Sequence, residues 1–182
     1  MYSSKLVLAI FLLIAAGCGS LKDDLFPSGA DKRPVIQQGT IGPAVGQLAP
    51  DFTLPDTLGN SITLSGVLPT QKAVVLYFTM WCPTCDSHMS HMESTVIPQF
   101  PSVRFFAVDY VSASVAESRN AEVSNGYSGS PFTVLADTAR TVLADYQGTM
   151  GTTVVIDAAG VIRMNEDYKD GTRLEAILGA LP

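Results

Sequence analysis

Two cysteines separated by two residues are the part of this sequence best suited to chemistry. Both lie in one short segment, Trp81-Cys82-Pro83-Thr84-Cys85. The segment follows an apolar run that is typical of a buried strand and precedes a pattern that is typical of a helix. Cysteines at this spacing and in this context can form a reversible disulfide within one chain. The pair therefore predicts thiol-disulfide redox chemistry.

The helix that begins after Cys82 gives the two sulfurs different roles. Pro83 suits the first helical position, because its missing N–H would have no intrahelical partner there. Cys82 is then the capping residue, where unpaired amide groups and the helix dipole favour the thiolate form of its sulfur. Cys85 lies about one turn further along and is more buried. We therefore expect Cys82 to attack a disulfide and Cys85 to resolve the mixed disulfide.

Two other uses of the pair are less consistent with the sequence. A structural zinc site commonly has four ligands, and the chain has one further cysteine, Cys18, with no second ligand pair. A purely structural disulfide across two residues would close a loop too short to restrain the unfolded chain much. These arguments favour a redox role that needs no metal or organic cofactor.

The first seventeen residues are typical of a secretory signal. Lys5 precedes an apolar stretch, 6–16, that is too short for a comfortable membrane span. Small residues then precede Cys18 and resemble a bacterial lipobox, although Ala15 stands where leucine is more usual. We expect residues 1–17 to be removed and Cys18 to be lipidated, so that the protein is anchored on the extracytoplasmic side of a bacterial membrane. A cleaved, soluble secreted protein is the alternative.

Composition predicts a tether and one domain after the signal. Residues 18–47 are rich in Gly, Ser, Pro, Lys and Asp without periodicity, which is typical of a flexible tether. Residues 48–182 have the size and apolar content of one domain. Removing Lys5 with the signal leaves ten basic residues of eleven against seventeen acidic ones. This balance, without a basic cluster, argues against nucleic acid or anionic lipid as a partner.

Apolar patterning within the domain alternates between strand and helix. Residues 51–54 and 61–64 alternate apolar and polar positions around Gly59, which predicts a hairpin. Runs at 74–78, 103–108 and 153–156 predict buried strands, and a turn at 157–160 predicts a second hairpin. Helical spacing occurs at 83–97, 114–125, 138–146 and 172–181. The pattern predicts an α/β fold with a mixed central sheet, flanking helices and an N-terminal β-hairpin extension.

Three motifs in this order resemble a known family. They are the segment 46–56, the strand that leads into Trp-Cys-Pro-Thr-Cys, and residues 152–157 with Gly160. Over residues 46–182 the chain resembles the extracytoplasmic, membrane-tethered thioredoxin-like proteins of the TlpA/ResA group, and also the peroxiredoxin superfamily. The resemblance implies a thioredoxin fold in which Cys82 and Cys85 react and Trp81 flanks them. It also implies partners: cysteines of exported proteins, such as apocytochromes, and a membrane dithiol donor. We expect a monomer.

The sequence departs from that family at two positions. Where the family has a cis-proline facing the disulfide, this chain has Gly151 after Met150, and we expect that peptide bond to be trans. These two residues form the expected substrate edge. Where thioredoxin has a buried aspartate, this chain has Leu76. Asp109 is a candidate substitute as proton acceptor, although a strand-end or capping role is the simpler interpretation.

Histidine and methionine after the motif raise a copper-handling alternative. Cys82, Cys85 and His88 would be its ligands, because soft Cu(I) accepts cysteine, histidine and methionine. Helical spacing instead places Met89 and Met92 on one apolar stripe with Cys85, which predicts core packing. His88 lies beside the stripe, where a hydrogen-bonded surface role is the simpler interpretation. His91 is expected further round, toward solvent.

A thiol peroxidase is the second alternative. Thr79 and Cys82 reproduce the Thr-x-x-Cys half of the peroxiredoxin signature. Val75 stands where that signature has proline, so the other half is missing. A peroxide would still oxidise an exposed thiolate slowly. For the oxidoreductase, the potential of the pair relative to its compartment decides whether it donates or accepts electrons.

Overall fold

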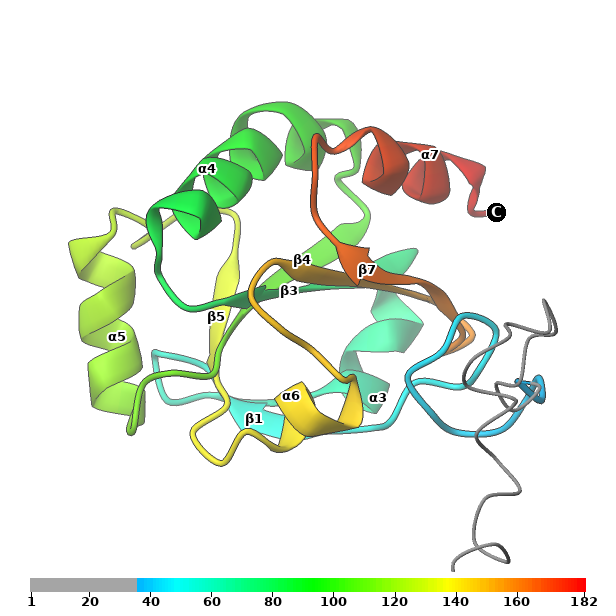
Figure 1. Ribbon diagram of the computed structural model, residues 1–182, viewed down its shortest axis with the longest axis horizontal. Helices are drawn as coiled ribbons and strands as arrows, with labels where there is room; N and C mark the ends of the chain where they lie inside the picture. The colour runs from blue at the N-terminus through cyan, green and yellow to red at the C-terminus, as the bar shows by residue number, and fades with distance from the viewer. Residues whose placement is uncertain (1–35) are drawn as a thin grey trace, which may run out of the picture. The chain divides into compact units, whose positions relative to one another are not determined.

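A five-stranded sheet forms the centre of the domain in the computed structural model, which describes residues 36–182 (Figure 1). Its strands are β3 (Ala73–Thr79), β4 (Val103–Asp109), β5 (Thr133–Ala136), β6 (Thr152–Asp157) and β7 (Ile162–Asp167). The spatial order is β5-β4-β3-β6-β7. Strands β3, β4 and β5 are parallel, whereas β6 is antiparallel to β3 and to β7. The expected mixed sheet is confirmed.

Strand β3 is buried along its whole length because layers cover both faces of the sheet. Successive side chains point to opposite faces of a strand. Val75 and Tyr77 accordingly belong to one hydrophobic core with α4, whereas Leu76 and Phe78 belong to the core on the other face. This alternation decides which residues of β3 can reach the cysteines.

Helices lie on both sides of the sheet and at its edge. Figure 1 shows α4 and α7 on one face, α3 and α6 on the other, and α5 beside β5. Their bounds are α3 (Leu64–Val67), α4 (Pro83–His91), α5 (Val115–Ser124), α6 (Thr141–Asp145) and α7 (Thr172–Ala180). Helix α4 continues through a π-helical turn, Met92–Val96, and a 3-10 turn, Ile97–Gln99, so the helix expected over 83–97 is confirmed with a change of pitch.

Helix α6 begins later than the expected residue 138. The Asp137 carboxylate accepts hydrogen bonds from the amides of Thr141 and Leu143, at 2.9 and 2.8 Å. These amides belong to the first turn of a helix and have no intrahelical partner. Residues 138–140 form the turn that brings Asp137 to them.

The predicted N-terminal hairpin pairs β1 (Thr53–Pro55) with β2 (Ser61–Thr63). Its turn carries Gly59 at φ +88°, a conformation that favours glycine. The Asp56 carboxylate accepts hydrogen bonds from the amides of Leu58 and Asn60, at 2.9 and 2.8 Å. The hairpin is thus held by its own turn chemistry.

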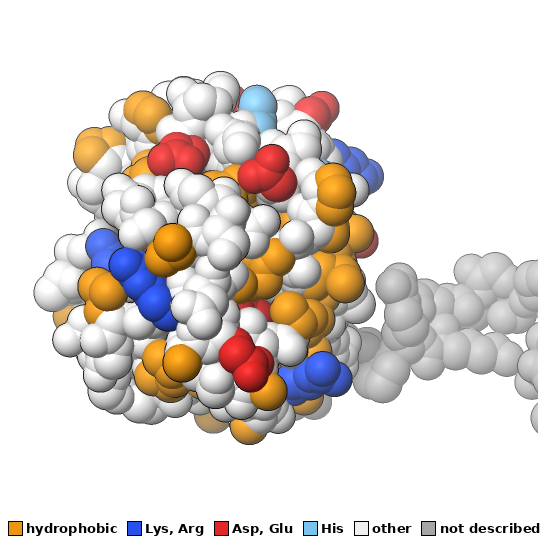
Figure 2. Space-filling model, turned by 90° about the vertical axis from the view of Figure 1, so that its left-hand side faces the viewer, with side chains coloured by type: hydrophobic (Ala, Val, Ile, Leu, Met, Phe, Trp, Pro, Cys, Tyr) orange, Lys and Arg blue, Asp and Glu red, His pale blue; other side chains and the backbone are white. Residues whose placement is uncertain are grey.

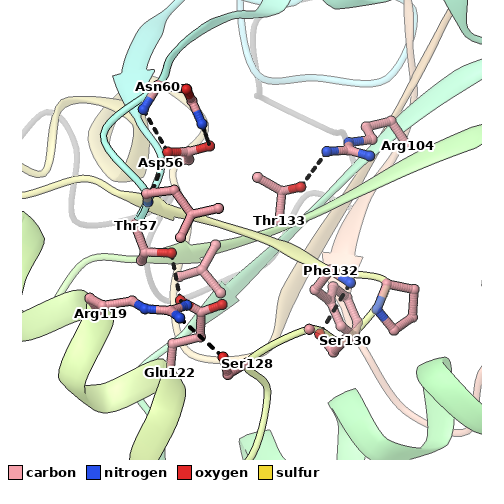
Figure 3. Close-up of a pocket in the computed structure, with 14 residues that line it drawn as sticks. Asp56, Thr57, Asn60, Arg104, Arg119, Glu122, Ser128, Ser130, Phe132 and Thr133 are labelled. Atoms are coloured by element: carbon pink, nitrogen blue, oxygen red, sulfur yellow. Dashed lines mark hydrogen bonds and ion pairs between the residues drawn. The ribbon is translucent and has the colours of Figure 1, made fainter.

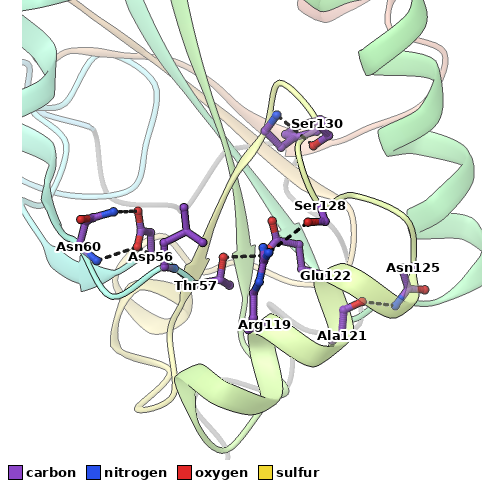
Figure 4. Close-up of polar contacts among 11 residues, drawn as sticks. Asp56, Thr57, Asn60, Arg119, Ala121, Glu122, Asn125, Ser128 and Ser130 are labelled. Carbon is purple, nitrogen blue, oxygen red and sulfur yellow. Dashed lines mark hydrogen bonds and ion pairs between the residues drawn. The ribbon is translucent and has the colours of Figure 1, made fainter.

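The hairpin turn also covers the outer edge of β5. The Thr57 amide donates to the Val134 carbonyl at 3.1 Å. Its hydroxyl donates to Glu122 of α5 at 2.5 Å, and Glu122 pairs with Arg119 at 2.8 Å (Figure 4). These groups line one side of a cavity of about 660 Å³ (Figure 3). An edge that would otherwise be open to pairing is closed.

The packed domain begins upstream of the expected residue 48. The Gly46 amide donates to the Ile162 carbonyl, and the Ile162 amide donates to the Gln47 carbonyl, both at 2.9 Å. The Asn165 side chain donates to the Pro43 carbonyl at 2.8 Å. Residues 1–17 and Cys18 lie outside the described residues. Within 36–182, no helix combines the length and apolar character needed to cross a membrane.

Candidate active site

Cys82 is the N-cap of α4, as the sequence predicts. Its backbone is extended, at φ −84° and ψ 163°, and Pro83 occupies the first helical position. The Cys85 amide donates to the Cys82 sulfur at 3.2 Å. An amide at a helix N-terminus stabilises negative charge on the group that it binds. The Cys82 sulfur therefore lies at the start of the helix with a backbone N–H directed at it.

The two sulfurs lie 2.8 Å apart and differ in exposure. Cys82 is partly exposed and Cys85 is fully buried, and both are free thiols. A partner protein can therefore react with Cys82, whereas Cys85 can react only with a mixed disulfide that has already formed on Cys82.

The environment of the pair favours ionisation. Burial opposes it, but hydrogen bonds from the Cys82 thiol, from the Met80 and Cys82 amides and from the Thr79 hydroxyl outweigh burial and lower the pKa of Cys85. Because the sulfurs are within hydrogen-bonding distance, they share a proton, and this ionisation belongs to the pair.

Trp81 is fixed between two neighbours. It has φ +58°, an uncommon value for a residue with a side chain, and its amide donates to the Thr79 hydroxyl at 3.1 Å. Its ring lies 6.2 Å from that of Tyr127. Tyr127 in turn donates to the Asp86 carboxylate at 2.8 Å, in the first turn of α4. This aromatic contact fixes the residue before Cys82 to the helix after it, and it was not predicted.

Asp109 is occupied at the end of β4. Its buried carboxylate accepts hydrogen bonds from the Val111 and Ser112 amides, at 3.0 and 3.1 Å, and from the Ser112 hydroxyl at 2.6 Å. The buried Trp81 indole N–H lies near it without standard hydrogen-bond geometry. Burial opposes ionisation, but the polar contacts outweigh it and lower the pKa of Asp109. The geometry is that of a strand-end cap, the simpler of the two interpretations.

The histidines after the motif bind tyrosines. His88 Nδ1 lies 3.0 Å from the Tyr77 hydroxyl, and His91 Nδ1 lies 2.6 Å from the Tyr168 hydroxyl. The expectation that His91 faces solvent is wrong, because its partly buried ring packs on Tyr168 at 6.2 Å between ring centres. Met89 and Met92 are fully buried in the core beside Cys85, as predicted.

The ligands of the copper alternative do not form a cluster in this structure. Among residues 36–182, no group of three or more His, Cys, Asp and Glu side chains is arranged to hold a metal ion. His88 directs Nδ1 at Tyr77. For the peroxidase alternative, Thr79 is buried and contacts Cys85 and the Trp81 amide.

Gly151 takes a conformation that proline cannot adopt. Its φ is +84°, whereas proline is held near −65°, and its peptide bond to Met150 is trans, as expected. Its amide donates to the Phe78 carbonyl at 3.0 Å, and its carbonyl accepts from the Tyr168 amide at 2.8 Å. A Cβ at this position would lie 3.6 Å from the His88 ring. The glycine brings the chain beside His88 and immediately precedes β6.

Exposed apolar side chains surround this end of the sheet. Met80 follows β3, Val111 follows β4 and Met150 precedes β6, with exposed fractions of 44%, 40% and 37%. Figure 2 views the molecule from the end at which β3 finishes and α4 begins, and shows hydrophobic side chains gathered there with charged ones spaced around them. Such a surface around Cys82 suits contact with apolar protein segments.

A dithiol at the N-terminus of the helix that follows a central strand, within this sheet order, defines a thioredoxin-like protein. The chain belongs to the AhpC/TSA family, whose family model matches residues 45–165. It is a thioredoxin-like protein of the TlpA/ResA type.

Two curated relatives carry this assignment. The chain is 31% identical to the thiol-disulfide oxidoreductase ResA of Geobacillus kaustophilus over 123 residues, which are 66% of this chain and 67% of that protein. It is 28% identical to the methylamine utilization protein MauD of Paracoccus versutus over 140 residues, which are 76% of this chain and 66% of MauD. The chain thus spans about two thirds of the length of these relatives.

Solved structures show the same fold. A putative thiol:disulfide interchange protein DsbE from Chlorobium tepidum superposes with a TM-score of 0.64 at 24% identity, over 76% of this chain and 97% of that one. A putative protein disulfide isomerase from Bacteroides thetaiotaomicron gives 0.63 at 21% identity, over 76% and 89%. The thioredoxin-like fold expected from the sequence is confirmed.

Proposed function

We propose that this protein is an extracytoplasmic thiol-disulfide oxidoreductase whose redox centre is Cys82 and Cys85. One observation supports this most: the sulfur of Cys82, a partly exposed residue, accepts an amide hydrogen bond at the start of α4, and the sulfur of the buried Cys85 lies 2.8 Å away. The first sulfur is accessible to a partner, and the second can displace that partner.

The reaction transfers two electrons without a metal or organic cofactor. The Cys82 thiolate attacks a disulfide of the partner, so that one partner sulfur leaves as a thiolate and a mixed disulfide forms. Cys85 then loses its proton and attacks the Cys82 sulfur. The second partner sulfur leaves, and the enzyme disulfide closes. A dithiol donor reverses the change in the enzyme.

We infer that the substrates are oxidised cysteines of exported proteins, for example apocytochromes before haem attachment, and that a membrane dithiol donor restores the pair. The relation to ResA, named a thiol-disulfide oxidoreductase, supports the reaction class. The apolar surface formed by Met80, Val111 and Met150 supports a protein partner rather than a small thiol. On this view the enzyme acts as a monomer.

We also propose that Cys18 is lipidated after removal of residues 1–17 and anchors the domain to a bacterial membrane. The support is the signal-like segment and the small residues before Cys18. In cells that express the full chain, the protein should sediment with membranes, and Cys18→Ser should release it into the soluble extracytoplasmic fraction. Equal membrane association of both forms would contradict lipid anchoring.

The catalytic assignment is tested by replacing each cysteine of the pair. Reduced wild-type protein should break a model disulfide stoichiometrically. Cys82→Ser should abolish the reaction, whereas Cys85→Ser should accumulate a mixed disulfide that mass spectrometry detects. If both variants retain full activity, the assignment is wrong. Hydrogen peroxide in place of the disulfide tests the peroxidase alternative, because a peroxidase would react faster with the peroxide.

A further inference from the structure

The resolving cysteine has a proton but no carboxylate to receive it. Cys85 is fully buried, and in the mixed disulfide Cys82 has no S–H left to donate to it. Leu76, at the position where thioredoxin has an aspartate, lies in the core on the opposite face of the sheet. Asp109 is occupied by its own turn. The groups that do lie beside Cys85 therefore decide how it ionises.

Tyr77 is one of these groups. It is the neighbour of Leu76 on β3, so it points to the face that contains Cys85, and it is fully buried there. Burial, together with the nearby Cys85 sulfur, which lies close to the hydroxyl without standard hydrogen-bond geometry, raises the pKa of Tyr77 above its ordinary value. The hydroxyl keeps its proton at all physiological pH values, so it can pass a proton on but cannot hold the charge itself.

His88 contacts the same hydroxyl. It follows Cys85 by three residues on α4, which places both side chains on one side of the helix. Its Nδ1 is 3.0 Å from the Tyr77 oxygen, and its ring is only partly buried. Burial lowers the pKa of His88 below its ordinary value, so the imidazole is neutral near pH 7. With its hydrogen on Nε2, the ring accepts the Tyr77 proton at Nδ1.

We propose that Tyr77 and His88 form a proton relay for Cys85, which deepens the proposed function and rests on it. As Cys85 attacks the mixed disulfide, its proton passes to the Tyr77 oxygen while the Tyr77 proton passes to His88 Nδ1. The S–S bond between Cys85 and Cys82 forms, the bond between Cys82 and the partner breaks, and the partner sulfur leaves as a thiolate. His88 then gives its proton to that thiolate or to water.

The relay requires neutral His88, which sets the direction of its pH dependence. The groups that face His88 are Tyr77 from β3 and Tyr168 after β7, whose ring centre is 4.9 Å away, and Cys85 and His91 lie three residues before and after it on α4. His91 is bound to Tyr168, and Asp170 lies near His91. No carboxylate among the described residues hydrogen-bonds His88. The resolution rate should therefore be constant near neutral pH and fall with acidification through the pKa of His88, which lies below its ordinary 6.5.

The two steps can be separated with 5,5′-dithiobis(2-nitrobenzoate), which releases one coloured thiolate on attack by Cys82 and a second on resolution by Cys85. The full chain with Cys18→Ser, reduced beforehand, carries this pair as its cysteines. Stopped-flow absorbance then compares three variants in that background. Tyr77→Phe removes the hydroxyl and keeps the ring, and His88→Gln keeps a hydrogen-bond acceptor without a basic nitrogen. His91→Gln is the matched control, because His91 binds Tyr168 instead of Tyr77.

The relay predicts that Tyr77→Phe and His88→Gln slow the second phase by about a hundredfold, a usual size for general base catalysis, and leave the first phase within about twofold. In His88→Gln, Cys85 must lose its proton to solvent before it attacks, so the rate of the second phase should rise with pH through the neutral range in which the rate of the parent protein is constant. His91→Gln should behave as the parent protein does. Slowing of the second phase by less than about threefold in either variant, or equal slowing of both phases, would overturn the relay. Failure of the parent protein to release the second thiolate would instead overturn the proposed function.

Discussion

At the scale of single residues, Gly151 is required by its backbone conformation. A side chain at φ +84° costs about 1–2 kcal/mol, whereas the space around the position is sufficient, since a Cβ would meet His88 at an ordinary 3.6 Å. Gly151→Ala should therefore lower the free energy of unfolding by about 1–2 kcal/mol, measured by urea denaturation.

Gly179 provides a matched control for this prediction. It lies in α7, and a Cβ there would meet nothing within 4 Å. Gly179→Ala should raise the free energy of unfolding, by about 0.5–1 kcal/mol, because alanine favours a helix over glycine. If both substitutions change the free energy of unfolding in the same direction, the left-handed conformation of Gly151 does not determine the effect of Gly151→Ala.

The sequence predicted the sulfurs of the site but not their surroundings. Cys82 as helix cap, Pro83 in the first turn and buried Cys85 follow from local rules, because a cap involves residues within one turn. Tyr77 reaches the site from β3 and Tyr127 from the loop after α5, and their contacts with His88 and Asp86 of α4 depend on tertiary packing. The alternation of β3 could have indicated Tyr77, since it points to the opposite side from Leu76.

At the scale of secondary structure, long periodic segments were predicted well and one short strand was missed. Strands β3, β4 and β6 agree with their apolar runs to within a residue at each end. Strand β5 has four residues, and its strand character comes from pairing with β4 and from the bridge between Asp56 and Leu135. A four-residue segment is too short to show the alternation of apolar and polar residues by which strands are recognised, so this long-range pairing could not be predicted from the sequence.

Helix α4 shows how the element and the site depend on one another. Its buried stripe, Cys85, Met89 and Met92, anchors it on β3, and Tyr127 fixes its first turn through Asp86. Two contacts therefore fix the start of α4 beside the dithiol: the packing of its buried side chains on β3 and the hydrogen bond between Tyr127 and Asp86. This preorganisation keeps the Cys85 amide on the Cys82 sulfur without further rearrangement.

At the scale of the whole molecule, the domain gathers its chemistry at one end of the sheet. The dithiol, the exposed apolar side chains and Gly151 come from segments that end or begin strands β3, β4 and β6. The opposite end receives residues 43–47, which pair with β7. The segment that leads from the proposed anchor thus joins the domain on strand β7, apart from the cysteines on α4.

The central claim is that Cys82 and Cys85 cycle together between dithiol and disulfide. The most direct measurement equilibrates the Cys18→Ser chain with glutathione buffers of graded potential, alkylates the remaining thiols and counts them by mass spectrometry. The account predicts one two-electron transition in which both thiols disappear together, and its midpoint gives the direction of electron flow relative to the compartment. Thiols that persist in fully oxidised glutathione, or loss of a single thiol to glutathione at Cys82, would contradict it.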